Sequence, residues 1–230
     1  MNINDKQRQE WVQKTLSVLP AGKILDAGAG ELRNRQYCSQ LEYVSQDFCQ
    51  YDGKGDNKGL QNQVWDTSKI DIVSDIADIP VDDECFDYVV CTEVFEHIKY
   101  PVDALKEFNR ILKPGGKLIL TAPFCSLTHM APYHIYSGFN QYFYSSVLPD
   151  CGYGNVLLAA NGNYFQYLEQ EIKRIGFMSK KYGNSKFSFL YKAMVVPTLL
   201  LYRMLGSKSE DTSELLCFGY NVTATKLVNK

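Results

Sequence analysis

Up to about residue 122, apolar and polar positions follow a regular alternation of two patterns. Short, almost continuously apolar runs alternate with stretches in which apolar residues recur at helical spacing. Uninterrupted apolar strands joined by helices are typical of a parallel sheet covered on both faces, so an α/β fold is expected. The runs predict strands at 23–26, 43–48, 70–75, 86–91 and 117–122, and helices at 4–19, 32–41 and 101–112.

The pattern is less regular after residue 122. Residues 123–163 are rich in Pro, Gly, His and Tyr and predict an irregular loop or lid. A helix over 164–175, a sixth strand over 177–182 and a last strand over 220–225 are expected to follow. The apolar segment 187–205 contains Pro197 and its uninterrupted part is too short to span a bilayer. It predicts a kinked helical insertion packed on the sheet, with a lipid-facing or dimer surface as the alternative.

Composition narrows the class of protein. The 230 residues suit one domain spanning 1–230, and a net charge of −2 gives no electrostatic basis for binding nucleic acid. The seven cysteines are scattered and never spaced as Cys-x-x-Cys, which favours free thiols in a reducing cytoplasm. The polar amino terminus lacks the apolar core of a signal peptide, and a cytoplasmic protein is therefore expected. No pattern indicates the oligomeric state.

A glycine turn at the end of the first predicted strand indicates a nucleotide-type site. Gly28 and Gly30 allow a sharp turn and a close approach of the backbone to a ligand. A third glycine, which a dinucleotide fingerprint would place at position 33, is replaced by Arg33. Asp26, before the turn, disfavours a pyrophosphate but can anchor a cationic group, directly or through water. S-adenosylmethionine carries such cationic groups, whereas NAD carries phosphates here, so the loop favours the former.

Further acidic residues are expected at the same edge of the sheet. Asp47 follows Asp26 by 21 positions, close to the spacing at which an acid binds ribose hydroxyls; the alternative is a solvated acid at a strand end. Asp75 and residues 91–93 also follow predicted strands. Because the carboxyl ends of parallel strands share one edge, these groups should converge on one crevice.

Five ordered motifs within about residues 20–125 resemble class I S-adenosylmethionine-dependent methyltransferases of the small-molecule type. They are ILDAGAG at 24–30, SDIADIP at 74–80, CFDYVVC at 85–91, EHI at 96–98 and RILKPGGKLIL at 110–120. The resemblance implies a three-layer, Rossmann-like fold. Its sheet would have seven strands, mostly parallel, with the antiparallel last strand lying between the fifth and sixth. One departure is Leu32, where many members have another glycine.

The resemblance also implies roles for individual residues in holding S-adenosylmethionine. Asp26, Gly28 and Gly30 would hold the methionine end. Asp47 would bind the ribose, and Phe48 would lie against the adenine. The remaining expected contacts are Asp75 and Ile76 at the adenine edge, and Thr92 and Glu93 on the wall near the sulfonium.

The acceptor is expected at the loop after the fifth strand. If the nucleophile is a hydroxyl, a general base contributes about 10²–10⁴-fold, and the loop supplies His129, His134 and Tyr136 as candidates. Packing among aromatic residues is the alternative role for these histidines. Two histidines five positions apart with no acid between them are not a metal-ligand set, so no metal site is expected. His97 is expected to be structural or to line the cavity.

A looser resemblance, to methyltransferases encoded with polysaccharide-building enzymes, favours a sugar-like small molecule as acceptor, with methyl transfer to a hydroxyl. Two other functions stay open. One is a nicotinamide-dependent oxidoreductase, which Asp26 and the missing third glycine disfavour. The other is a non-catalytic member of the fold that binds cofactor or a partner without turnover.

Overall fold

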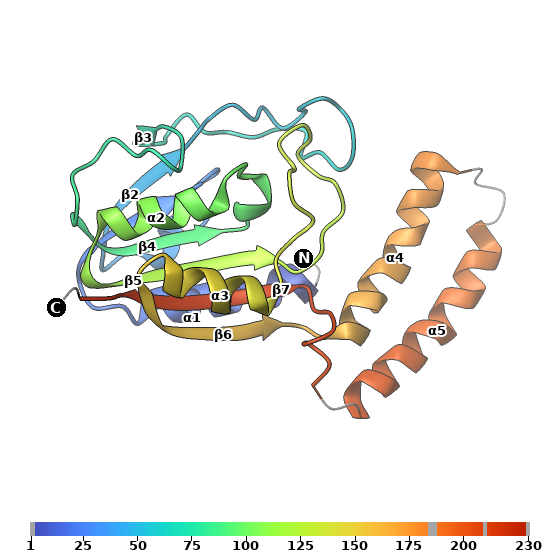
Figure 1. Ribbon diagram of the computed structural model, residues 1–230. Coiled ribbons are helices and arrows are strands. Elements are labelled where there is room, and N and C mark those ends of the chain that lie inside the picture. Colours follow the sequence, from blue (N-terminus) through green and yellow to red (C-terminus); the bar gives the residue numbers. More distant parts are fainter. Residues whose placement is uncertain (1–2, 184–187, 209–210, 229–230) are drawn as a thin grey trace.

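The computed structural model describes residues 3–183, 188–208 and 211–228, and its centre is one seven-stranded sheet (Figure 1). The strand order is β3-β2-β1-β4-β5-β7-β6; β7 pairs antiparallel with both β5 and β6, and the other pairs are parallel. The expected position of the last strand, between the fifth and the sixth, is confirmed. The strands are β1 Lys23–Ala27, β2 Glu42–Asp47, β3 Ile72–Val73, β4 Phe86–Thr92, β5 Leu112–Pro123, β6 Tyr153–Asn161 and β7 Gly219–Lys226.

Helices cover both faces of the sheet, as the apolar strands predict (Figure 1). On one face Val12 and Leu16 of the first helix pack on Ile24, Val90 and Ile119. The other face carries α2 and α3, whose buried side chains contact the alternate residues of the same strands. The helices are α1 Ile3–Ser17, α2 Pro101–Ile111, α3 Gln141–Asp150, α4 Tyr164–Tyr182 and α5 Ser188–Lys208, with short 3-10 turns η1 Arg35–Tyr37 and η2 Phe95–His97.

Several predicted elements are wrong in kind or extent. The helix expected over 32–41 is only the 3-10 turn η1, and the third strand is reduced to Ile72–Val73. Within 123–163 the long irregular part is residues 124–140, because α3 and β6 occupy most of the rest. Residues 177–182, expected as a strand, continue α4, and Gly176 lies inside that helix rather than at its end. Apolar residues recur at helical spacing along the whole of α4, but Gly176 was interpreted as the end of the helix.

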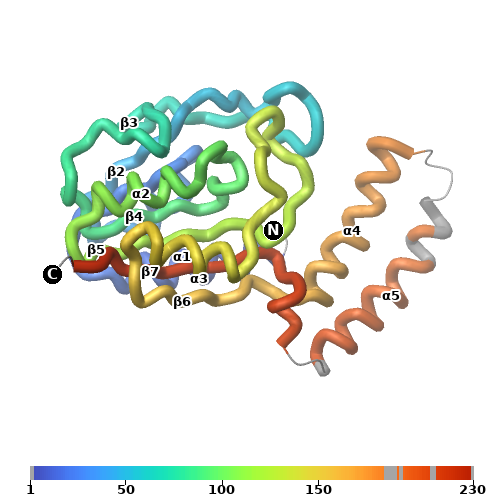
Figure 2. Tube along the Cα trace, viewed as in Figure 1, coloured from blue at the N-terminus to red at the C-terminus, as the bar shows by residue number. Residues whose placement is uncertain are grey.

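The helices α4 and α5 form a hairpin beside the sheet rather than a layer on it (Figure 2). Tyr191 of α5 donates a hydrogen bond to the Ile172 carbonyl, and Arg203 pairs with Glu169, so the hairpin is held by its own contacts. The prediction that this apolar helix packs on the sheet is therefore wrong; Phe187, its expected first residue, lies outside the described residues. Among the described helices none is long and apolar enough to cross a membrane.

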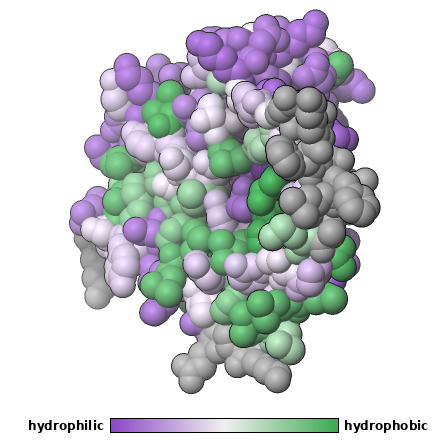
Figure 3. All heavy atoms as spheres, turned by 90° about the vertical axis from the view of Figure 1, so that its right-hand side faces the viewer, coloured by the Kyte–Doolittle hydropathy of each residue, from purple (hydrophilic) through white to green (hydrophobic). Residues whose placement is uncertain are grey.

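Much of the apolar surface of the hairpin faces solvent. Figure 3 views this side of the molecule and shows hydrophobic side chains over it. No described side chain of α4 is fully buried. The large apolar side chains exposed on the hairpin are Ile175, Phe177, Met194, Val196, Leu200, Leu201, Met204 and Leu205.

Candidate functional site

One cavity of about 1050 Å³ lies at the carboxyl edge of the sheet, where sequence analysis expects the crevice. It is bounded by the turn after β1, the ends of β2 and β4, and the loop after β5. The amino-terminal helix and α4 supply two further walls. Residues that are distant in the sequence thus meet at the point where ligands bind in open α/β sheets.

The glycine turn adopts the backbone that its sequence predicts. Gly28 and Gly30 have φ of +71° and +49°, in a region that residues other than glycine rarely adopt. A Cβ on Gly28 would come within 2.5 Å of Val94, and one on Gly30 within 2.5 Å of Trp65. The turn is fixed to β2, because the Gly28 N–H donates to the Gln46 carbonyl at 2.8 Å. Both glycines line the cavity.

Asp47 lies at the end of β2 with its carboxylate held by backbone. Its Oδ2 accepts from the Gly30 N–H at 2.9 Å, and its Oδ1 accepts from the Cys49 N–H at 2.8 Å. Each carboxylate oxygen retains acceptor capacity for a further donor. Phe48, Asp75 and Ile76 line the cavity beside Asp47, so the structure brings this predicted group together.

Asp26 does not line the cavity. Its side chain is buried beneath the turn, where it accepts from the Tyr43 hydroxyl at 2.5 Å and from Asn34 Nδ2 at 3.1 Å. Burial raises its pKa to about 6, although both hydrogen bonds work in the opposite direction. Asn34, which donates to Asp26, does line the cavity.

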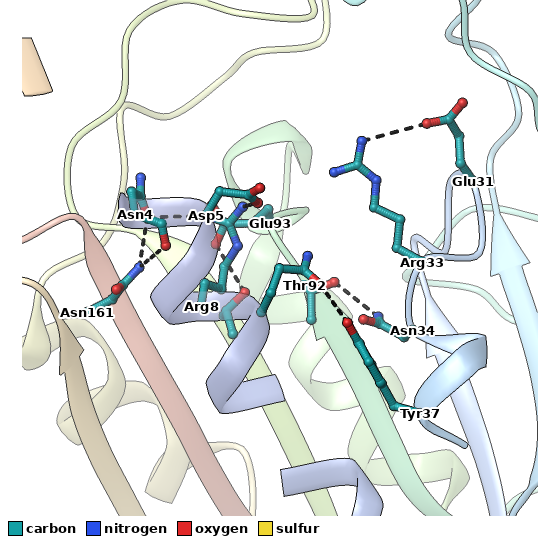
Figure 4. A network of polar contacts seen from close by, with 12 residues as sticks. Asn4, Asp5, Arg8, Glu31, Arg33, Asn34, Tyr37, Thr92, Glu93 and Asn161 are labelled. Atoms are coloured by element: carbon teal, nitrogen blue, oxygen red, sulfur yellow. Dashed lines mark hydrogen bonds and ion pairs between the residues drawn. The ribbon is translucent and has the colours of Figure 1, made fainter. Parts of the chain in front are cut away.

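The end of β4 is linked to the first helix by an ion pair. Arg8 Nη1 donates to Glu93 Oε2 at 2.9 Å, and Arg8 Nη2 donates to Asp5 (Figure 4). Glu93 has φ of +54° and accepts from Thr121 through its other oxygen. Thr92 Oγ1 accepts from Asn34 Nδ2 at 3.2 Å, so both predicted wall residues are held in place.

The three histidines of the chain gather beside the end of β4. The ring centroids of His97 and His129 lie 4.7 Å apart, as do those of His129 and His134. Glu96 Oε1 lies 3.6 Å from His129 Nε2 and 3.7 Å from His97 Nε2. In the sequence His97 directly follows Glu96, but nothing there indicates that His129 and His134 meet them.

Burial and mutual contact shift the acidities in this cluster. Burial raises the pKa of Glu96. Burial, reinforced by the nearby His129, lowers the pKa of His97 to about 3. For His129, burial lowers the pKa, but the nearby Glu96 carboxylate and the hydrogen bond to the Leu127 carbonyl raise it by more. Neighbouring groups whose pKa values are shifted in opposite directions are typical of functional sites.

His134 and Tyr136 lie at the margin of this region. His134 Nε2 is hydrogen-bonded to Ser126 Oγ at 3.0 Å, and the Tyr136 hydroxyl donates to the Lys99 carbonyl at 3.0 Å. Neither side chain lines the main cavity, whereas His129 does. Tyr136 instead lines a separate shallow hollow. Of the three candidate bases, only His129 is in position to meet a ligand in this cavity.

Several lining residues escaped the sequence analysis. Arg8 comes from a helix whose period was recognised but whose position on the sheet was not. Trp65 comes from the long loop 50–69, which carries no regular pattern. Tyr167, Gln170 and Arg174 recur at helical spacing along α4 and form the wall on that side. That spacing is the one signal in the sequence that could have indicated a shared face.

A seven-stranded sheet in this order, with a glycine turn after β1 and an acid at the end of β2, defines the class I methyltransferase fold. Residues 25–120 match the family described as "Methyltransferase domain". The chain is also 29% identical over 177 residues to a demethylmenaquinone methyltransferase of Staphylococcus carnosus, covering 73% of this chain and 68% of that protein.

Solved structures agree on the fold. A phosphoethanolamine N-methyltransferase of Haemonchus contortus in complex with S-adenosyl-L-methionine superposes with a TM-score of 0.54 at 16% identity, covering 96% of this chain and 52% of that one. The [4+2]-cyclase SpnF superposes with a TM-score of 0.55 at 16% identity, covering 97% and 81%. The chain thus spans about two thirds of the curated relative and about half of the first of these structures. Its fold is that of the class I S-adenosylmethionine-dependent methyltransferases, and its residues 25–120 match their methyltransferase domain.

Proposed function

We propose that this chain transfers a methyl group from S-adenosylmethionine to a hydroxyl-bearing small molecule. One observation carries the proposal. The glycine turn with Asp47 and the loop with His129 line the same cavity, so a cofactor and an acceptor can meet there. Exclusion of water and alignment of the reacting groups supply most of what such a transfer requires.

The residues present fit the cofactor. Asp47 is proposed to accept both ribose hydroxyls, and Phe48 with Ile76 to pack on the adenine. Gly28 and Gly30 are proposed to let the backbone of the turn approach the methionine end of the cofactor closely, because neither residue has a side chain. S-adenosylmethionine supplies an already activated methyl group on a sulfonium. Asp26 is proposed to act indirectly, by fixing Asn34.

The acceptor is proposed to lie against the loop after β5. This part of the cavity is lined by Leu60, Leu127, Met130, Pro132 and Ile135, with His129 among them. Such a lining suits a flat, largely apolar ring that carries a hydroxyl, and the demethylmenaquinone methyltransferase relative agrees with a quinone-like ring. The polysaccharide resemblance would favour a sugar, which this lining suits less well.

Calorimetric titration with S-adenosylhomocysteine tests the cofactor. We expect saturable binding, and the absence of binding at high micromolar ligand would refute the proposal. A parallel titration with NADH tests the oxidoreductase alternative. If that alternative is correct, NADH should bind and S-adenosylhomocysteine should not.

Radiolabelled methyl transfer tests the acceptor. Reduced naphthoquinones, simple phenols and free or lipid-linked sugars form the panel. Labelling of the aromatic hydroxyl compounds supports the proposed ring, and labelling of sugars alone would overturn it. Cofactor binding with no transfer to any compound would favour the non-catalytic alternative.

A further inference from the structure

A small buried cluster beside the cavity has more acceptors than donors. It consists of Glu96 and His97 from η2 and His129 from the loop after β5. Their ligand-type atoms all lie within 4.8 Å of one another. Among the described residues, Glu96 Oε2 and His97 Nε2 are buried side-chain atoms with no hydrogen-bond partner. Glu96 itself is only 1% exposed, and an unpaired buried carboxylate is costly.

We propose that Glu96, His97 and His129 bind a divalent transition-metal ion, through one carboxylate oxygen and the two Nε2 atoms. This ion-binding site stands on the geometry of the side chains and does not depend on the proposed methyl transfer. The three ligands line the cavity, so coordination positions left by the protein would open toward the proposed acceptor.

The tautomers of both histidines suit metal binding. His97 Nδ1 donates to the Tyr133 carbonyl at 3.1 Å, and His129 Nδ1 donates to the Leu127 carbonyl at 2.8 Å. In a neutral imidazole Nδ1 then carries the one N–H, and Nε2 presents a lone pair toward Glu96. Lone pairs facing a carboxylate repel it unless a proton or a metal cation lies between them. Backbone carbonyls that fix Nδ1–H are the usual outer partners of metal-bound histidines.

The spacing of the atoms also suits a shared ion. Glu96 Oε1 lies 3.6 Å from one Nε2 and 3.7 Å from the other, too far for a good direct hydrogen bond. Ligands about 2.0–2.1 Å from one tetrahedral ion lie about 3.3–3.4 Å apart, so the two oxygen–nitrogen separations need to close by only a few tenths of an ångström. The two histidine nitrogens lie within 4.8 Å of each other.

The donor set selects the class of ion. Two imidazoles and one carboxylate suit zinc, iron(II), cobalt(II) and similar ions, whereas magnesium and calcium prefer oxygen ligands. Three protein ligands with the remaining positions free are characteristic of catalytic rather than structural zinc sites. An oxygen of a bound acceptor is the group that such a position would take.

The position of the cluster is fixed by the fold. The Glu96 carbonyl accepts from the N–H groups of Ile135 and Tyr136, which ties the loop after β5 to η2. His129 is thereby held next to two residues that precede it by more than thirty positions. The sequence spacing gave no indication of this ligand set.

The test uses the full chain, stripped with a chelator and then loaded with Zn²⁺ or Co²⁺. We expect one ion per chain after gel filtration, a visible Co²⁺ spectrum typical of nitrogen and oxygen ligands, and no competition by excess Mg²⁺. His129→Ala and Glu96→Gln should each weaken Zn²⁺ binding by at least about 100-fold, more than loss of an outer partner would. Circular dichroism and S-adenosylhomocysteine binding check that both variants fold.

Two matched variants define the ligand set. His134→Ala removes the third histidine, whose Nε2 is bonded to Ser126, and should leave Zn²⁺ affinity within a few fold. Cys125→Ser removes an exposed thiol that also lines the cavity and should change nothing. Substoichiometric metal in the wild type, sulfur-to-cobalt charge transfer, unchanged affinity in His129→Ala or lost affinity in His134→Ala would each overturn the proposal.

Discussion

Arg8 and Glu93 are 85 positions apart in the sequence, yet their side chains form a 2.9 Å ion pair that joins the first helix to the end of β4. Both side chains are mostly shielded from solvent and both line the cavity. The first helix is therefore part of the ligand site as well as part of the covering layer.

Arg8→Ala should weaken both the fold and the site. Loss of the pair leaves Glu93 partly buried without its cation, which should cost about 1–2 kcal/mol of unfolding free energy and several-fold in S-adenosylhomocysteine affinity. Urea unfolding and calorimetry measure the two effects. Lys6→Ala, which breaks the exposed pair with Glu10 on the same helix, is the control and should change neither by much. Equal effects of the two substitutions would contradict a role for Arg8 in the site.

Asp47→Asn should reduce cofactor affinity with little change of shape. The amide cannot accept from two hydroxyls and the Gly30 N–H as a carboxylate does, and a hydrogen bond to a charged group contributes about 1.5–3 kcal/mol. We expect S-adenosylhomocysteine to bind about 10–100-fold more weakly by calorimetry. Asp52→Asn, on the exposed loop that follows, should bind as the wild type does. Unchanged affinity in Asp47→Asn would remove Asp47 from the ribose site.

Asp26 should make the protein less stable as the pH rises from about 4 to 7. Its pKa of about 6 in the fold lies above its ordinary value of 3.8, so the folded state holds its proton more tightly than the unfolded state does. The difference of about two pH units corresponds to roughly 3 kcal/mol of stability, present below pH 4 and lost above pH 6. Asp26→Asn should abolish this contribution.

The measurement compares unfolding free energies of wild type and Asp26→Asn at several pH values. The difference between them should move in favour of the variant as the pH rises through 4 to 6. A constant difference across that interval would show that Asp26 does not carry the raised pKa. Asp66→Asn is a suitable control, because its carboxylate is exposed and its pKa is lowered rather than raised.

Replacing Leu32 by glycine should give a more stable protein than replacing it by alanine. Its φ of +59° lies in the left-handed region, which costs residues with a Cβ about 1–2 kcal/mol. Leu32→Gly and Leu32→Ala both remove the partly buried side chain, so their difference isolates the backbone. We expect the glycine variant to be more stable by about 1 kcal/mol in urea unfolding. The opposite order would mean that the turn relaxes when Leu32 is replaced.

The sequence predicts those parts of the fold that a local pattern of residues specifies. Strands such as Phe86–Thr92 are mostly buried, so they stand out in the sequence as apolar runs. The turn after β1 is also predictable, because its backbone conformation requires glycine. The resemblance supplied the antiparallel position of β7, which no local pattern contains. Leu32 was recognised as a departure, but only the structure connects it with a left-handed backbone.

The errors have physical reasons as well. Residues 153–161 form β6 at the edge of the sheet, where alternate side chains are exposed and polar residues are tolerated, so the run looked irregular. The histidine cluster depends on a contact between η2 and a loop more than thirty residues later. The sequence of one segment does not predict its contact with the other, because tertiary contacts of this kind produce no periodic pattern.

The hairpin of α4 and α5 leaves and rejoins the sheet at one point. Asn161, the last residue of β6, is paired with Gly219, the first of β7, so the intervening chain closes on itself like an insertion in a tight turn. None of the hairpin side chains whose burial the structure describes is fully buried, yet α4 forms one wall of the cavity. A change in the hairpin therefore alters the α4 wall of the cavity, while the sheet that carries the glycine turn and Asp47 stays as it is.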